Sequence, residues 1–305
     1  MLSEKVVCAY LYPITKYGYP PPARDTVKHI REMQKLGFQS IELEGVREQH
    51  LLEMYEMRFQ VRDVLKELNL RIPFFCAVLP NLTSPSKDER KKQLKLFEKG
   101  CEIAQTLNAY GILDNAPLPP YIFPEKIPLV RHYGEAVISS ASFPPTLSWK
   151  EFWTYLLETY REACDIAAGH GLTYHLHPSI GVLSSTTDGF LYFHDAVKKD
   201  NLRFNFDTAN QFAMKENLSL SLRRLADFVD YIHLSDNHGL TVEHLKAGQG
   251  AIQWDVFFDT LAAIDYRGYI GVDIGGEESK IADLDDAYVS TAAWLEQNWT
   301  ERASR

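Results

Sequence analysis

The chain has 305 residues, 45% apolar side chains and a formal net charge of −9 at pH 7. This length suits one large α/β domain, and we treat residues 1–305 as a single domain. The acidic balance excludes nucleic acid as the main partner and disfavours an anionic membrane surface, because no surplus of Lys and Arg is present to neutralise phosphates.

The cysteines and the N-terminus indicate a reducing compartment. The four cysteines are scattered and form no C-x-x-C pair, which favours buried free thiols over disulfides or a zinc site. Residues 1–10 lack the basic segment and apolar run of a signal peptide, and no apolar run is long enough to span a bilayer. We therefore expect a cytoplasmic protein that does not enter a membrane.

Short apolar segments alternate with longer segments of helical periodicity along the chain. The predicted strands cover residues 5–10, 39–43, 71–78, 109–113, 172–177, 202–206, 231–234 and 269–274. Eight strand–helix units imply right-handed crossovers and a parallel sheet, and eight such units close naturally into a (β/α)8 TIM barrel. A doubly wound open sheet is the alternative, but no G-x-G-x-x-G or Walker motif accompanies it.

Helix boundaries are marked by capping residues. Ser86 and Ser148 are each followed three residues later by a glutamate, which is the pattern of a capping box. Thr187 can cap the helix that ends near residue 199. The first helix, 24–36, stops before a glycine, and the last is predicted over 284–299.

The segment 115–147 does not resemble scaffold. It holds seven prolines and several aromatic residues, and it follows the fourth predicted strand. In a barrel it lies over the mouth, as does the Tyr- and Pro-rich stretch 10–22 after the first strand. Long loops in compact domains are usually functional or disordered, and the aromatic content favours an ordered lid or a contact between subunits of a homo-oligomer.

Each of four consecutive predicted strands has, within one residue of its end, a residue that can bind a metal, namely His177, Asp207, His233 and Asp273. Catalytic groups of a barrel lie at these strand ends. Taken singly, each has a structural interpretation, such as a hydrogen-bonded histidine, a helix cap or a turn residue. Together they predict one divalent metal ion, and two imidazoles with two carboxylates suit Mn²⁺, Co²⁺, Fe²⁺ or Zn²⁺ better than Mg²⁺ or Ca²⁺.

The chain also resembles the xylose-isomerase-like barrel superfamily of sugar phosphate isomerases and epimerases. The resemblance is clearest over 171–273 and is carried by the stretches 206–208, 232–236 and the G-x-G-x-I tail at 248–252. It implies one divalent metal held by strands five to eight, where the superfamily usually supplies Glu, Asp, His and Glu. The matching positions here are His177, Asp207, His233 and Asp273.

Two of these four positions depart from the superfamily pattern. In its epimerases the two glutamates also carry the proton on opposite faces of the carbon beside the carbonyl. His177 and Asp273 occupy those positions here, so inversion by two bases is not expected. The stretch 171–181 is more similar to the inosose dehydratase branch.

These features predict a metal-dependent isomerase or epimerase acting beside the carbonyl of a sugar-like substrate. One alternative is a dehydratase or lyase acting on a keto-inositol or keto-sugar, including an oxidised glycoside. The other is a non-catalytic carbohydrate-binding protein or partner subunit. Without a recognisable phosphate cradle, an unphosphorylated carbohydrate or polyol is the favoured ligand.

Further candidates surround the predicted metal. His175, which shares a strand face with His177, and Glu42 are catalytic candidates beside Asp273. His175 has an equally good interpretation as a core histidine of the lower barrel. The substrate-binding candidates are Glu44, Asn210, Asp236 and Arg131.

Overall fold

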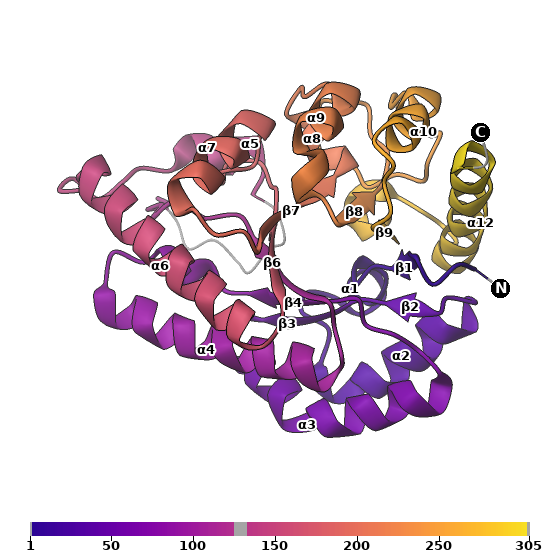
Figure 1. Ribbon diagram of the computed structural model, residues 1–305, viewed down its shortest axis with the longest axis horizontal. Coiled ribbons are helices and arrows are strands. Elements are labelled where there is room, and N and C mark those ends of the chain that lie inside the picture. Colours follow the sequence, from indigo (N-terminus) through magenta and orange to yellow (C-terminus); the bar gives the residue numbers. More distant parts are fainter. Residues whose placement is uncertain (1, 125–132, 304–305) are drawn as a thin grey trace.

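Nine parallel strands pair in the order β2-β1-β9-β8-β7-β6-β5-β4-β3 in the computed structural model, which describes residues 2–124 and 133–303. The two outermost strands, β2 (Ser40–Ile41) and β3 (Leu43–Val46), are halves of one segment separated only by Glu42. The first half pairs with β1 and the second with β4. The sheet therefore closes on itself through this segment, as the predicted α/β barrel requires (Figure 1).

The other strands are β1 (Val6–Cys8), β4 (Phe74–Val78), β5 (Gly111–Asn115), β6 (Thr173–His177), β7 (Leu202–Asp207), β8 (Tyr231–Leu234) and β9 (Tyr269–Val272). The α-helices are α1 (Leu11–Tyr17), α2 (Thr26–Lys35), α3 (Arg47–Leu68), α4 (Lys87–Thr106), α5 (Glu135–Ser140), α6 (Trp149–Gly169), α7 (Thr187–Val197), α8 (Thr208–Ala213), α9 (Leu218–Leu225), α10 (Trp254–Ala263), α11 (Gly276–Ser279) and α12 (Leu284–Ala303). Short 3-10 turns cover Ala23–Asp25, Pro80–Thr83 and Ala226–Phe228.

All eight predicted strands are present; the one over 231–234 has the predicted bounds, and the others have shifted ends. The third begins at Phe74 rather than at residue 71, since Pro73 has no N–H to donate to a neighbouring strand. The first hydrogen bond of each predicted capping box is present. The hydroxyl oxygens of Ser86 and Ser148 accept from the backbone N–H groups of Glu89 and Glu151, respectively. The cap of α7 is Thr186, one residue before the predicted Thr187.

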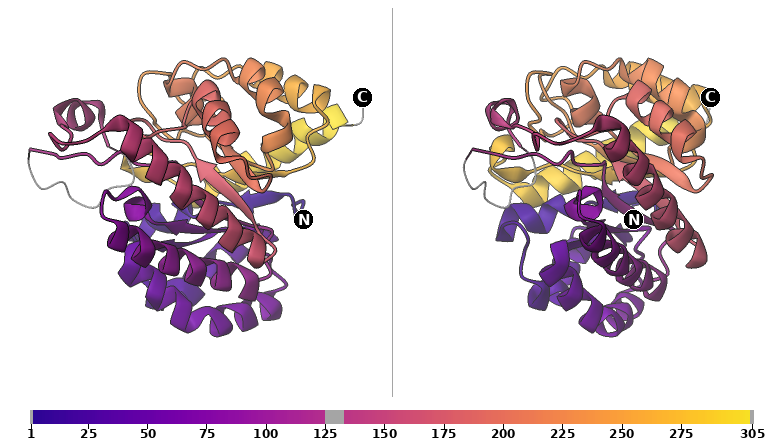
Figure 2. Two further views of the ribbon diagram at one scale, coloured as in Figure 1. Left: turned by 60° about the vertical axis from the view of Figure 1, so that its left-hand side comes forward. Right: turned by 90° about the vertical axis from the view of Figure 1, so that its left-hand side faces the viewer.

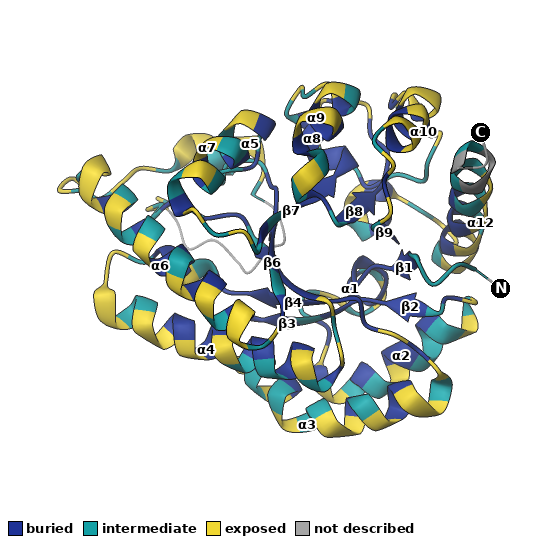
Figure 3. Cartoon of the chain, viewed as in Figure 1, coloured by how far each residue is buried: buried dark blue, intermediate teal, exposed yellow. Residues whose placement is uncertain are grey.

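The helices surround the strands and turn one face outward, so the strands are buried on both sides (Figures 2 and 3). The interior of the barrel is filled rather than open. Phe74 stacks on Tyr231 with ring centroids 4.3 Å apart, and the His175 ring packs edge-on against Phe74. This aromatic layer fills the barrel interior below the carboxyl ends of the strands, which is the end where barrels of this kind carry their sites.

The described parts of the segment 115–147 are folded against the barrel mouth. Ile122 and Ser142 form an antiparallel bridge, and α5 lies within the segment. The Tyr121 hydroxyl donates to the carbonyl oxygen of Gly181 at 2.5 Å, in the loop after β6. None of the described helices is long and apolar enough to cross a membrane.

Candidate metal centre

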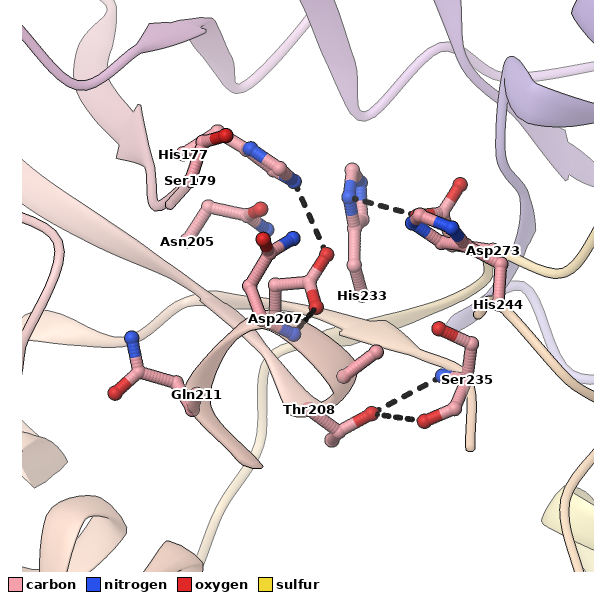
Figure 4. Close-up of polar contacts among 12 residues, drawn as sticks. His177, Ser179, Asn205, Asp207, Thr208, Gln211, His233, Ser235, His244 and Asp273 are labelled. Carbon is pink, nitrogen blue, oxygen red and sulfur yellow. Dashed lines mark hydrogen bonds and ion pairs between the residues drawn. The ribbon is translucent and has the colours of Figure 1, made fainter. Parts of the chain in front are cut away.

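The four predicted ligands lie together at the carboxyl ends of β6, β7, β8 and β9. His177 Nε2 is 3.1 Å from Asp207 Oδ2, and His233 Nδ1 is 3.7 Å from Asp273 Oδ2. Asp207 and His233 are register partners on adjacent strands. All four side chains are buried, and Figure 4 shows them pointing toward one another.

Asp207 divides its two oxygens between structure and site. As the N-cap of α8, its Oδ1 accepts from the backbone N–H of Asn210 at 2.7 Å. Its Oδ2 is directed to His177. Burial opposes the charge, but the contact with His177 holds the pKa of Asp207 well below its usual range. The helix-cap interpretation and the ligand interpretation are therefore compatible, because each uses a different oxygen.

Glu42 fixes the orientation of His233. Glu42 Oε2 lies 3.0 Å from His233 Nε2, while its Oε1 accepts the N–H of Tyr10. Burial disfavours a charged ring, yet the carboxylates of Glu42 and Asp273 outweigh it and raise the pKa of His233 to about 9. A carboxylate that holds one histidine nitrogen, so that the other faces a metal, is a common arrangement around bound metals.

A free ring nitrogen of His233 fits a metal ion. Among the described residues, no hydrogen-bond partner reaches the buried Nδ1 of His177 or that of His233. His177 faces Asp207 through Nε2, so its Nδ1 lies on the side of the ring away from the cluster. A buried polar atom without a partner is costly. Of these two nitrogens, His233 Nδ1 faces the Asp273 carboxylate at a separation too long for a hydrogen bond. The donor set of imidazole nitrogens and carboxylate oxygens is one that divalent transition metals accept.

His244 joins this cluster although the sequence analysis did not select it. It is fully buried in the loop between β8 and α10, and its Nε2 lies 3.9 Å from Asp273 Oδ2. Its Nδ1 is 2.8 Å from Glu278 Oε1. The signal in the sequence was a histidine just ahead of the G-x-G tail. Because it lies in a loop, no strand periodicity placed it at the site.

A cavity opens directly onto the cluster. His177, His233, Asp273, Glu42 and Glu44 line it, and its other walls are Leu11, Ile14, Tyr19, Cys76, Val78, Leu113 and Asn115. The stretch 10–22 thus lies at the mouth, as predicted. A second cavity shares Tyr19, Val78 and Asn115 with the first and is also lined by Arg47 and Tyr133. The described part of the segment 115–147 therefore contributes to the surroundings of the site.

Three other candidates lie elsewhere or have different partners. His175 is in the lower barrel, where its Nε2 contacts the hydroxyl of Thr173 at 2.8 Å and burial lowers its pKa to about 3. Asp236 is buried and accepts from the N–H groups of Asn237, Gly248 and Ile252 and from the Trp254 indole. Neither lines the cavity at the cluster. Arg131 is outside the described residues.

Asn210 stays close to the cluster through its backbone bond to Asp207. Its side-chain amide is buried, and neither its oxygen nor its nitrogen has a hydrogen-bond partner among the residues that the structure describes. Such an amide can form hydrogen bonds with a ligand or a water molecule. Asn210 lines neither of the two cavities at the mouth, so its expected substrate-binding role stays a prediction.

Known proteins resemble the chain over most of its length, at low identity. The 3-dehydro-D-guloside 4-epimerase of Escherichia coli is 22% identical over 289 residues, covering 91% of this chain and 95% of that enzyme. A D-allulose 3-epimerase from Methylomonas sp., solved in complex with D-allulose, superposes with a TM-score of 0.73 at 18% identity and covers 98% of both chains.

A third relative matches over a shorter region. An uncharacterized protein of Methanocaldococcus jannaschii is 28% identical over 149 residues, which is 46% of this chain and 50% of that protein. The chain therefore matches only half the length of that relative.

A family model described as the xylose isomerase-like TIM barrel matches residues 30–298, in agreement with the closed parallel barrel. The chain belongs to the xylose isomerase-like TIM-barrel family.

Proposed function

We propose that this protein is a divalent-metal-dependent enzyme of the sugar isomerase and epimerase type, which moves a proton beside the carbonyl of a keto-sugar. The observation that carries the proposal is the buried cluster of His177, Asp207, His233 and Asp273 at the barrel mouth, where Nδ1 of His233 faces Asp273 without a hydrogen-bond partner among the described residues. Relatives of the same fold that are epimerases of keto-sugars add weight to it.

The residues that would hold the metal are His177, Asp207, His233 and Asp273. A divalent ion bound there would stabilise the negative charge that develops on the substrate oxygen when the neighbouring carbon loses its proton. Glu42 would keep Nδ1 of His233 turned to the site through its contact with Nε2. The Asp207 side chain would remain in place because its second oxygen caps α8.

Asp273 is the group that we assign to proton transfer. It is ionisable, lines the cavity and lies within 4 Å of both His233 and His244. Glu42 is already engaged by His233 and Tyr10, so a positioning role suits it better than a catalytic one. Glu44 lines the same cavity and is assigned to substrate hydroxyl groups, together with Asn210.

Proton transfer on a single face of the substrate follows from the residue types. The epimerases that this chain resembles use two glutamates for proton transfer, and His177 occupies the position of one of them. A neutral imidazole that binds a metal through one nitrogen cannot accept a substrate proton through the same nitrogen. Isomerisation by one base is therefore expected. Elimination of a β-substituent, the dehydratase or lyase outcome, also needs only one base and is the second candidate.

The substrate class that we favour is an unphosphorylated keto-sugar or an oxidised glycoside. The named relatives act on a 3-dehydro-glycoside or bind a ketose. The cavity combines carboxylates with the apolar side chains of Leu11 and Ile14 and the ring of Tyr19. Such walls suit a sugar ring, whose hydroxyl groups and C–H surfaces both need partners.

The test is proton exchange in deuterated water. Metal-stripped protein is reloaded with Mn²⁺, Co²⁺ or Zn²⁺ and incubated with D-allulose, other ketoses and 3-keto-glycosides. Deuterium at the carbon beside the carbonyl, with formation of an isomer, is the expected result by mass spectrometry and NMR. Loss of a β-substituent would instead support the lyase alternative. No exchange with any of these substrates would contradict the proposal.

The matched control compares two aspartates. Asp207→Asn removes the charge at the cluster but leaves an oxygen to cap α8, so it should abolish exchange without unfolding the chain. Asp255→Asn alters a highly exposed aspartate paired with Arg302, and it should leave exchange unchanged.

A further inference from the structure

We propose that a cavity at the amino-terminal end of the barrel, opposite the metal cluster, binds a phosphorylated ligand with a planar ring, a class that nucleoside monophosphates represent. The cavity lies where the strands begin, since its walls include Tyr110, directly before β5, and Tyr269, the first residue of β9. Its volume of about 690 Å³ is within the range of small-molecule sites. The inference goes beyond the proposed function, because this cavity shares no described lining residue with the cavity at the cluster.

The charged side chains that line this cavity are cations, and among the described residues no carboxylate lines it. Arg62 and Lys66 lie one turn apart on α3, which packs beside α4 (Figure 1), and Arg71 follows the helix. The chain as a whole has 41 acidic and 32 basic residues, so its composition does not predict a wall of cations alone. A groove of about 600 Å³ between α4 and α6 shows the usual mixture, because lysines and carboxylates line it together.

These cations are available to an anionic ligand. Lys66 is exposed and forms no ion pair with any described residue. Arg62 pairs with Asp63 and Arg71 with Glu4, but both pairs are exposed to solvent and contribute little, so a phosphate can replace either carboxylate. A cation in the last turn of a helix also complements the helix dipole, which accounts for Lys66. Arg71 lies beyond the end of α3, so the dipole does not explain its place in this wall.

Two tyrosines provide flat ring surfaces in the same cavity. Tyr110 is 47% exposed although its ring is large, and Tyr269 is half-buried. Both rings pack edge-on against Phe74, with centroid separations of 5.9 and 5.7 Å. Because Phe74 itself stacks on Tyr231 in the filled interior of the barrel, the two tyrosine rings are held in place before a ligand arrives. Accessible rings of this kind are the surfaces on which planar bases stack.

The combination of charge and rings points to one ligand chemistry. The cations come from residues 62–71, whereas the rings come from the starts of β5 and β9. A free phosphate would use only the cations, and a neutral ring would use only the tyrosines. Asn108, just beyond α4, also lines the cavity, and its side-chain amide forms no hydrogen bond with a described residue. Such an amide can bind the polar edge of a base. A nucleoside monophosphate would use all three features at once.

Calorimetric titration of the full chain tests the proposal without depending on turnover. AMP, GMP, CMP and UMP are titrated beside inorganic phosphate and the four corresponding nucleosides. We expect at least one nucleotide to bind about tenfold or more tightly than both phosphate and its own nucleoside, because only the nucleotide uses the cations and the rings together. Absence of binding by all four nucleotides at millimolar concentration, or binding no tighter than that of phosphate, would overturn the proposal.

Variants establish where the nucleotide binds. Lys66→Ala and Tyr110→Ala should each weaken binding about tenfold, since one removes a charge and the other a stacking surface. Tyr110→Phe keeps the ring and should bind like the wild type. Lys91→Ala, in the mixed groove, and Asp207→Asn, at the metal cluster, should leave the affinity unchanged. If Tyr110→Ala folds poorly, Lys66→Ala still decides, because Lys66 is exposed. Undiminished binding by Lys66→Ala, or lost binding in a folded Asp207→Asn, would refute this site.

Discussion

At the scale of single residues, the site is defined by carboxylates that serve two partners. Asp207 caps α8 with one oxygen and contacts His177 with the other. Glu42 accepts from the backbone of Tyr10 and orients His233. The positions of the two histidines therefore depend on the carboxylates behind them as much as on the strands.

Glu42→Gln is expected to weaken metal binding about ten- to a hundredfold while the fold is retained. Glutamine can still accept from Tyr10, but it lacks the charge that supports His233, and loss of such support typically has this effect on metal affinity. Competition with a chelating dye measures the affinity. Glu67→Gln, at an exposed pair with Arg31, is the control. An unchanged affinity in Glu42→Gln would show that Glu42 does not position His233.

At the scale of elements, the loop between β8 and α10 is organised around one buried side chain. The Asp236 carboxylate accepts from three backbone N–H groups and from the Trp254 indole, and its backbone pairs with Leu245. This arrangement fixes the loop that carries His244. Asp236 was expected at the substrate, but its acceptors are used within the loop. The described part of the loop after β5 is also folded at the mouth. We predicted that this loop covers the site or packs beside it, and this stays a prediction.

Asp236→Asn should lower the free energy of unfolding by about 2–4 kcal/mol. The amide NH₂ would face at least one buried donor that now has no acceptor, and each such group costs about 1–3 kcal/mol. Urea unfolding followed by circular dichroism measures the change. Asp265→Asn, at an exposed aspartate paired with Arg267, should shift stability by less than about 0.5 kcal/mol. Equal stabilities of the two variants would contradict this account of the loop.

At the scale of the whole molecule, closing the barrel brings strand ends into one ring and buries polar groups around it. Asp114 on β5 is one of these groups, with Oδ1 accepting from the N–H of Leu79 and of Asn115. Burial raises its pKa to about 8 despite these two bonds. The folded chain therefore holds a proton on Asp114 over a pH range in which the unfolded chain has released it.

This proton makes stability depend on pH with a definite sign. A carboxyl whose pKa is raised by folding stabilises the fold below its ordinary pKa near 3.8, and that contribution is lost as pH rises toward 8. Between pH 5 and 7 the loss is about 2–3 kcal/mol, since one proton corresponds to about 1.4 kcal/mol per pH unit. Asp114→Asn, which keeps an acceptor for Leu79, should flatten this dependence in urea unfolding series. An identical pH dependence in wild type and variant would exclude Asp114 as its source.

The sequence alone determined the barrel, its eight strands and four members of the cluster. Apolar runs of strand length recur along the chain and mark the eight strands. The residues His177, Asp207, His233 and Asp273 each lie at or near the end of such a run. In a parallel barrel the carboxyl ends of all strands meet at one face, so position along the chain is enough to predict proximity. The family predicted from these motifs is confirmed.

Only the tertiary structure decided which other polar residues reach the cluster. His244 lies in a loop whose path depends on the contacts of Asp236 and Gly275, and no periodicity encodes that path. His175 shares a strand face with His177, yet two residues along a tilted strand place it among Phe74 and Tyr110 in the lower barrel. Glu42 meets His233 across 191 positions of sequence. Such contacts arise only when the closed barrel brings strands that are distant in the sequence around one interior, which is why the sequence did not predict them.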